Sequence, residues 1–126
     1  MKRLFAFFFI SIFFFSCQKD KQVSIVGLWV EISACLRDNA GTFDCDETPK
    51  FPLRVTLSED GKYSFFNDVP AGRGNYQYNY SSKQLIFENS GGNVDIRTVS
   101  LLDDDYLIID YFSNGLVEYR QKFLRK

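Results

Sequence analysis

Gly74-Asn75-Tyr76-Gln77-Tyr78-Asn79-Tyr80 alternates aromatic and polar side chains without a break. Because successive side chains of a β-strand point to opposite faces, this stretch predicts a strand with tyrosines on one face and amides on the other. Ser81-Ser82-Lys83 follows as a turn and leads into residues 84–88, where Leu85 and Phe87 share a face. The two segments therefore predict an antiparallel hairpin.

The same alternation recurs along the chain between turn residues. Asp60-Gly61 is typical of a two-residue hairpin turn, and Asn89-Ser90-Gly91-Gly92-Asn93 and Ser113-Asn114-Gly115 are further turns. The predicted strands cover residues 26–34, 53–57, 62–67, 74–80, 84–88, 94–102, 105–112 and 116–124. Eight consecutive strands with short links predict an all-β fold, an eight-stranded antiparallel up-and-down barrel, which leaves no strand edge exposed. The only long link is residues 35–52, which is predicted as a loop.

The N-terminal residues have the composition of an export signal. Met1-Lys2-Arg3 is positively charged, residues 4–15 are apolar apart from Ser11, and the chain turns polar after Cys17. The apolar run is too short for the roughly 20 residues that cross the hydrocarbon core of a bilayer. We therefore expect a removable signal peptide at residues 1–16, a lipidated cysteine and polar tether at residues 17–24, and a barrel domain at residues 25–126.

Phe14-Phe15-Ser16-Cys17 resembles the lipobox of bacterial lipoproteins, in which the cysteine is lipidated and becomes the new N-terminus. Its phenylalanines resemble those of Bacteroidota lipoboxes, and the resemblance implies several acyl chains on Cys17, enough for stable anchoring. Cys17-Gln18-Lys19-Asp20 also resembles the surface-export signal of these lipoproteins, although Lys21 replaces an expected acid. We expect a lipid anchor in the outer membrane, at the cell surface or on the periplasmic face. The alternative is an ordinary secreted protein.

The composition excludes several classes of function. The chain contains no histidine, so neither a Ser-His-Asp nor a Cys-His catalytic arrangement is possible. Removal of residues 1–16 leaves 110 residues with a net charge of −3 and scattered basic residues, which argues against nucleic-acid binding. Gly72-Arg73-Gly74 lacks the helix that follows a phosphate-binding loop. We expect no cofactor and no catalytic activity; an enzyme that uses scattered carboxylates remains a third hypothesis.

Cys35 and Cys45 are the two cysteines that remain besides Cys17. An even pair of cysteines in an exported protein of this size predicts a disulfide, here one that fastens residues 36–44. A redox or metal-binding pair is the alternative, but the chain offers no histidine or third free thiol to complete such a site.

Acidic residues gather in two places. Asp44, Asp46 and Glu47 flank Cys45, and Asp103-Asp104-Asp105 forms a second group. Calcium binds to several oxygens at once, but neither group has the spacing of a dedicated calcium loop. Consecutive aspartates are typical of solvated turns, so we expect no metal site.

Motifs in the predicted strands resemble the lipocalin-like domain of small Bacteroidota outer-membrane lipoproteins. Gly27-Leu28-Trp29 is similar to the Gly-x-Trp start of lipocalins, and Asp60-Gly61-Lys62-Tyr63 and Gly74-Asn75-Tyr76 are similar to a hairpin and a strand of that domain. The resemblance covers about residues 25–125. It implies that Trp29 closes one barrel end beneath a basic residue of the last strand, either Arg120 or Arg125.

The barrel interior is either filled or hollow. Without residues 1–16, the chain keeps seven tyrosines, seven phenylalanines and one tryptophan. An eight-stranded barrel is just wide enough for side chains to fill it or for one small ligand. If a pocket exists, we expect Tyr76, Tyr78, Tyr80 and Trp29 to line it, because tyrosines supply flat apolar rings and orienting hydroxyls. The alternatives are a core filled by these rings and a tyrosine stripe that faces outward.

Two functions follow from these predictions. The first is a membrane-anchored, non-catalytic lipocalin-like barrel that binds a small hydrophobic molecule. The second is a solid-core structural or interaction module of the cell envelope that contacts a protein or glycan through its loops, since loops on rigid scaffolds often carry recognition. In either case we expect a monomer that binds no nucleic acid.

Lipidation of Cys17 can be tested by substitution. Cys17→Ala removes the thiol that receives the lipid, so we expect an unprocessed, unlipidated precursor. The measurement is detergent-phase partitioning of the expressed protein together with the mass of its N-terminal peptide. A native chain without an added lipid mass would contradict the lipoprotein prediction.

Overall fold

The computed structural model describes residues 22–126. The predicted signal peptide, the lipidation site at Cys17 and the first part of the tether lie outside these residues. Within residues 22–126, no helix is long and apolar enough to cross a membrane.

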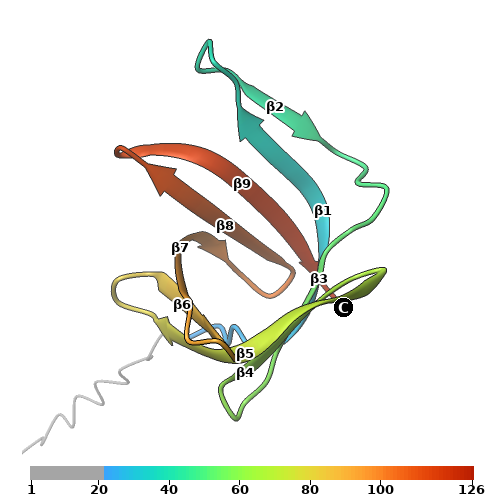
Figure 1. The fold of residues 1–126 in the computed structure, drawn as a ribbon, viewed down its shortest axis with the longest axis vertical. Coiled ribbons are helices and arrows are strands. Elements are labelled where there is room, and N and C mark those ends of the chain that lie inside the picture. Colours follow the sequence, from blue (N-terminus) through green and yellow to red (C-terminus); the bar gives the residue numbers. More distant parts are fainter. Residues whose placement is uncertain (1–21) are drawn as a thin grey trace, which may run out of the picture.

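The described residues form nine antiparallel strands that build one closed sheet (Figure 1). Beginning with β3, each strand pairs with the next, β1 pairs with β3, and β1 also pairs with the last strand, β9. This closure makes the predicted eight-stranded up-and-down barrel, with β2 as an extra strand attached to β1. The strands are β1 (Gly27–Arg37), β2 (Phe43–Asp46), β3 (Arg54–Leu57), β4 (Lys62–Asn67), β5 (Val69–Asn79), β6 (Gln84–Asn89), β7 (Val94–Leu102), β8 (Tyr106–Ser113) and β9 (Leu116–Arg125).

Part of the link between residues 35 and 52 is a strand, in contrast to the predicted loop. β1 continues to Arg37, and the chain then reverses at Asp38, whose carboxylate accepts hydrogen bonds from the backbone N–H groups of Ala40 and Thr42, both at 2.9 Å. β2 returns along β1 and places Cys45 opposite Cys35. The predicted disulfide joins them with an S–S distance of 2.06 Å. Residues 38–42 therefore form the turn of a hairpin that was not predicted from the sequence.

The fifth strand starts earlier than its alternating tyrosines indicate. β5 begins at Val69, directly after Asp68, which turns the chain with a positive φ of 60°. Its first half, with Pro70 and Gly72, pairs with β4 across a bulge. This first half lies where β5 has not yet met β6, since the β5–β6 pairing begins at Gly74.

Trp29 and Arg125 close one end of the barrel. Trp29 is fully buried, and its indole N–H donates to the Ile25 carbonyl at 2.9 Å. The guanidinium of Arg125 lies 4.1 Å from the centre of the Trp29 ring and donates to the carbonyls of Ser24, Val26 and Asp104 at 2.7–2.8 Å. Of the two basic residues considered for this position, Arg125 is the one over the ring. Arg125, in the last strand, thereby connects the segment before β1 to the turn before β8.

Gly27 makes room for this contact. Its φ is +152°, and a Cβ at this position would lie 3.0 Å from Nη1 of Arg125. A side chain would therefore meet the guanidinium group that covers Trp29. The Gly-x-Trp spacing at residues 27–29 thus has a steric reason, because the glycine clears space for the cation over the ring.

Apolar side chains fill the half of the barrel next to Trp29. The inward-facing residues near this closed end are almost completely buried: Val55, Leu57, Leu85, Val99, Leu107 and Phe123. Tyr76 joins them, and its hydroxyl donates to the Ser58 carbonyl at 2.7 Å. This part of the interior is a packed core, which agrees with the filled alternative for an eight-stranded barrel.

An ion pair between partly exposed Arg120 and buried Asp110 joins β8 and β9 on the side of the sheet opposite to the core residue Ile109. Asp110 is 1% exposed and accepts from Arg120 through both oxygens, at 2.7 and 2.9 Å, and also from the Ser100 hydroxyl. These hydrogen bonds raise the pKa of the Arg120 guanidinium above its usual range. Arg120 therefore lies on the outer side of the barrel and is not the residue over Trp29.

We expect truncation of Trp29 at the closed end to lower the stability of the barrel strongly. Trp29→Ala removes a fully buried ring and the surface on which Arg125 rests, so we expect a loss of about 3–5 kcal/mol in the free energy of unfolding. Urea denaturation of the purified barrel measures it. Phe51→Ala is the control, because the Phe51 ring is 54% exposed and its removal is expected to change stability by about 0.5 kcal/mol or less. Similar losses in both variants would contradict a buried closing role for Trp29.

Candidate functional site

The end of the barrel opposite to Trp29 is the open end. β1 starts at Gly27 beside Trp29 and runs away from it, so the successive antiparallel strands place the turns at Asp68, at residues 90–93 and at residues 114–115 at the far end. Most exposed large apolar side chains lie around this end: Leu36, Phe43, Phe51, Phe66, Val69, Val94, Phe112 and Leu116. The β1–β2 hairpin extends beyond it (Figure 1).

A cavity of about 240 Å³ lies inside the barrel on the side of the open end. Its wall comes from β3, β4 and β6 to β9 and consists of Leu53, Val55, Phe65, Phe87, Asp95, Arg97, Ile109, Tyr119, Gln121 and Phe123. The side chains of Asp95 and Arg97 are 47% and 25% exposed, so the cavity reaches solvent beside them. The barrel is therefore solid next to Trp29 and hollow toward its open end.

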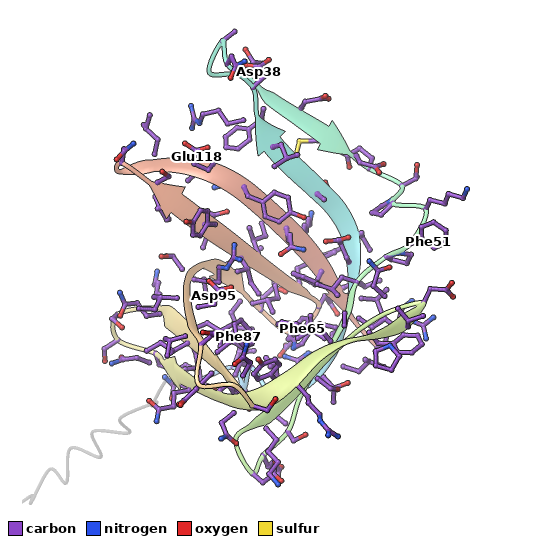
Figure 2. The ribbon with its side chains drawn as sticks, in the orientation of Figure 1. Asp38, Phe51, Phe65, Phe87, Asp95 and Glu118 are labelled. Atoms are coloured by element: carbon purple, nitrogen blue, oxygen red, sulfur yellow. A yellow bond between two sulfur atoms is a disulfide. The ribbon has the colours of Figure 1, made fainter. Side chains whose placement is uncertain are left out.

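Aromatic rings form one wall of the cavity. Phe65 on β4 and Phe87 on β6 lie with their ring centres 5.2 Å apart, and each also packs at 4.8 Å against Tyr63. Figure 2 shows Phe65 and Phe87 on the inner side of the barrel, with Asp95 also facing the interior. Edge-to-face packing of these rings fixes their positions, so this wall is a preformed apolar surface.

An ion pair from β7 adjoins this aromatic wall, because Asp95 lies opposite Phe87 in the β6–β7 pair. Arg97 donates from Nε and Nη2 to one oxygen of Asp95, at 3.0 and 2.8 Å. The guanidinium also lies 4.7 Å from the ring centre of Tyr111 on β8. Arg97 is therefore held in place by a carboxylate and by an aromatic face.

The inward direction of this ion pair reverses the usual pattern of a half-buried strand. Asp95 and Arg97 line the interior, whereas Val94 and Ile96 point outward and are 58% and 52% exposed. A strand that serves only stability places its valine and isoleucine in the core. Sites at which a local rule is broken are candidates for function, so β7 marks the cavity as a candidate site.

The buried carboxylate of Glu31 lies behind Gln121, a residue of the cavity wall on β9. Glu31 is only 8% exposed and is opposite the core residue Phe123 in the β1–β9 pair. Gln121, which lines the cavity, donates from Nε2 to Glu31 at 2.5 Å, and the backbone N–H of Leu53 donates at 3.5 Å. Burial raises the pKa of the neighbouring Tyr119 hydroxyl, and the negative charge of Glu31 raises it further. Tyr119 is therefore a neutral hydroxyl at neutral pH.

The tyrosine stripe faces the interior, but toward the closed end. Tyr76 belongs to the core, Tyr78 packs against the core, and the Tyr80 hydroxyl accepts a hydrogen bond from the Ile25 backbone N–H at 3.2 Å. None of these tyrosines, nor Trp29, is among the residues that line the 240 Å³ cavity. Tyr78 and Tyr80 instead border a shallow hollow of about 310 Å³ beside Gln22 and Val23.

Sequence reasoning missed the four polar residues that line the cavity, Asp95, Arg97, Tyr119 and Gln121, and also the Glu31 carboxylate behind Gln121. Asp95 and Arg97 share a face with Val99, and Tyr119 and Gln121 share a face with Phe123. This period-two spacing was visible in the sequence. Without the register, however, charged residues at alternate positions indicate the solvent side of a strand.

Other hollows and clusters of the described residues are less enclosed. Two larger hollows, of about 460 and 320 Å³, lie on the outer surface and are bordered mainly by exposed side chains such as Lys62, Arg73 and Arg54. Within residues 22–126, no three histidine, cysteine or acidic side chains are arranged to hold a metal ion. Asp103 accepts from the backbone N–H groups of Asp105 and Tyr106, which lowers its pKa and makes it a turn residue.

The cavity is identified by its geometry alone. No protein-family model matches the chain, and no curated protein is significantly similar to it. The features that distinguish the cavity are its enclosed position, its aromatic wall and the charged groups that face inward at Asp95, Arg97 and Glu31. Such an arrangement of apolar surface with a few polar groups is suited to holding a small molecule.

Proposed function

We propose that the protein is a lipid-anchored, non-catalytic binding protein of the lipocalin-like type, which holds a small, largely apolar molecule in the open half of its barrel. The observation that carries the proposal is the 240 Å³ cavity with its apolar wall and few polar groups. Binding sites for small molecules combine these features, because apolar area supplies affinity and a few polar groups fix the orientation.

The size of the cavity limits the ligand. Pockets for drug-sized molecules have volumes of about 300–1,000 Å³, and this one is smaller. A water molecule occupies about 30 Å³ of liquid, so the cavity has room for the equivalent of about eight waters. The proposed ligand is therefore compact, with a body of a single ring or a short chain, and any longer part extends through the open end.

The anchor sets the direction in which the cavity opens. The described chain enters the barrel at its closed end, where the Ser24 carbonyl binds Arg125. Residues 18–24 span at most about 25 Å when fully extended. A lipid on Cys17 therefore holds the closed end near the outer membrane, and the open end faces away from it. The ligand enters from the solvent side.

The second candidate, an interaction module, is favoured by the β1–β2 hairpin. The disulfide staples this hairpin, and Leu36 near its tip is 59% exposed. Phe51 in the following segment is 54% exposed. Apolar side chains held out on a rigid hairpin suit contact with an envelope protein or a glycan. This function uses the outer surface and does not require the cavity.

Ligand binding is tested by native mass spectrometry of residues 18–126 after exposure to a lipid and metabolite extract of the source cells. We expect one discrete added mass that is lost on collisional activation. Leu53→Trp places a larger ring in the cavity wall and is expected to abolish the added mass. Ile96→Trp is the matched control, because Ile96 is 52% exposed on the outer side of β7.

The outcome distinguishes the two candidate functions. An added mass that persists in a folded Leu53→Trp variant would place the ligand elsewhere on the molecule. If the native barrel acquires no mass while a known lipocalin captures its ligand from the same extract, the cavity function is contradicted. The interaction module then becomes the better account.

A further inference from the structure

The charged side chains that face the open half of the barrel interior do not sum to zero. Toward the open end, the inward-facing charged groups of the described chain are Glu31, Asp95 and Arg97. Arg97 pairs with Asp95, and the other ion pair among residues 22–126 joins Arg120 to Asp110 on the opposite side of the sheet. Glu31 therefore has no cationic partner in the described part of the chain. The open half of the interior thus carries one negative charge in excess.

This excess charge is buried in an apolar setting. Glu31 is 8% exposed, and its hydrogen bonds come from the neutral amide of Gln121 and from a distant backbone N–H. Burial of a carboxylate without an opposite charge is costly, and neutral donors offset only part of the cost. A glutamate that only filled space could be replaced by a leucine or glutamine without this penalty. A bound cation would offset it.

The aromatic lining suits a cation as well. Phe65, Phe87, Tyr119 and Phe123 line the cavity, and none of these rings carries a lysine or arginine over its face within residues 22–126. Aromatic faces attract cations, more strongly when the cation is removed from water. In this barrel the rings of Trp29 and Tyr111 already hold guanidinium groups. The free rings of the cavity offer the same surface to a ligand.

We infer that the ligand of this cavity is a small organic cation, an amine or ammonium group on a compact apolar body, held by the aromatic rings and by the negative charge of Glu31 behind Gln121. This inference rests on the proposed binding function and specifies its ligand class. An anionic ligand is disfavoured, because Asp95 already occupies Arg97 and Glu31 repels a second negative charge.

Three eight-carbon probes of matched size test the charge preference. n-Octylamine, 1-octanol and octanoate are titrated into residues 18–126 at pH 7 by isothermal titration calorimetry. We expect the amine to bind about tenfold more tightly than the alcohol, and octanoate to bind most weakly. Alcohol or octanoate binding as tight as that of the amine would overturn the cation assignment and leave the binding function standing. If none of the three binds, the proposed binding function itself is contradicted.

Glu31→Gln tests the residue that carries the assignment. The amide keeps the shape of the side chain and an acceptor oxygen for Gln121, removes the charge, and replaces the oxygen that faces the Leu53 N–H by an NH2 group. We expect amine affinity to fall to that of octanol, with octanol affinity unchanged. Glu88→Gln is the matched control, because Glu88 is exposed on the outer side of β6 and loses the same charge. Equal effects of the two variants would overturn the role of Glu31.

Asp95→Asn gives a second, independent readout if Glu31→Gln does not fold. This change frees Arg97 from its ion pair and leaves the interior without excess charge. We expect octanoate affinity to rise about tenfold, with a smaller preference for the amine. Unchanged affinities of Asp95→Asn for octanoate and for the amine would show that interior charge does not select the ligand, which overturns the inference.

Discussion

The pairing of β1 with β9 is the constraint on which the rest of the molecule depends. It converts a meander of sequential hairpins into a closed barrel, and the contact between Arg125 and Trp29 locks the seam at one end. The last strand thereby holds the first, since Arg125 also binds the carbonyls of Ser24 and Val26. A cavity inside a sheet of this size persists only if the sheet cannot open along its seam. The interior cavity therefore depends on the closure of the barrel.

The interior has a packed half and a hollow half. Near Trp29, large aliphatic side chains such as Leu57, Leu85 and Leu107 fill the barrel completely. Toward the open end, charged and polar groups replace them, and these cannot close the space without losing their hydrogen bonds. A bulge in β1 between Glu31 and Ser33 changes the register against β9, so that Glu31 faces the interior opposite Phe123 while Cys35 lies opposite the outward-facing Arg120. The bulge thus places the Glu31 carboxylate on the inner face of β1 and the disulfide of Cys35 on its outer face.

The fold was largely predictable, because alternation and turn residues depend only on local sequence. Strands at residues 62–67 and 94–102 were predicted with their observed bounds, and the disulfide followed from the cysteine count. The hairpin of β2 was missed, because its strand, Phe43–Asp46, has only four residues and follows a run rich in Asn, Gly and Asp, which is typical of a loop. The site was not predictable for a related reason. Asp95 and Arg97 look like a solvent face until the register places Val94 and Ile96 outside, and register depends on the whole closed sheet.

The most direct test of this account is a crystal structure of the native protein, purified from the source cells, at a resolution that shows bound small molecules. The account predicts a closed barrel whose open half stays hollow, with Glu31 hydrogen-bonded to Gln121 and with discrete density against Phe65 and Phe87. A barrel in which Phe65, Phe87 and Tyr119 close together and leave no space in front of Gln121 would contradict it. The protein would then be a solid scaffold that acts through its outer surface.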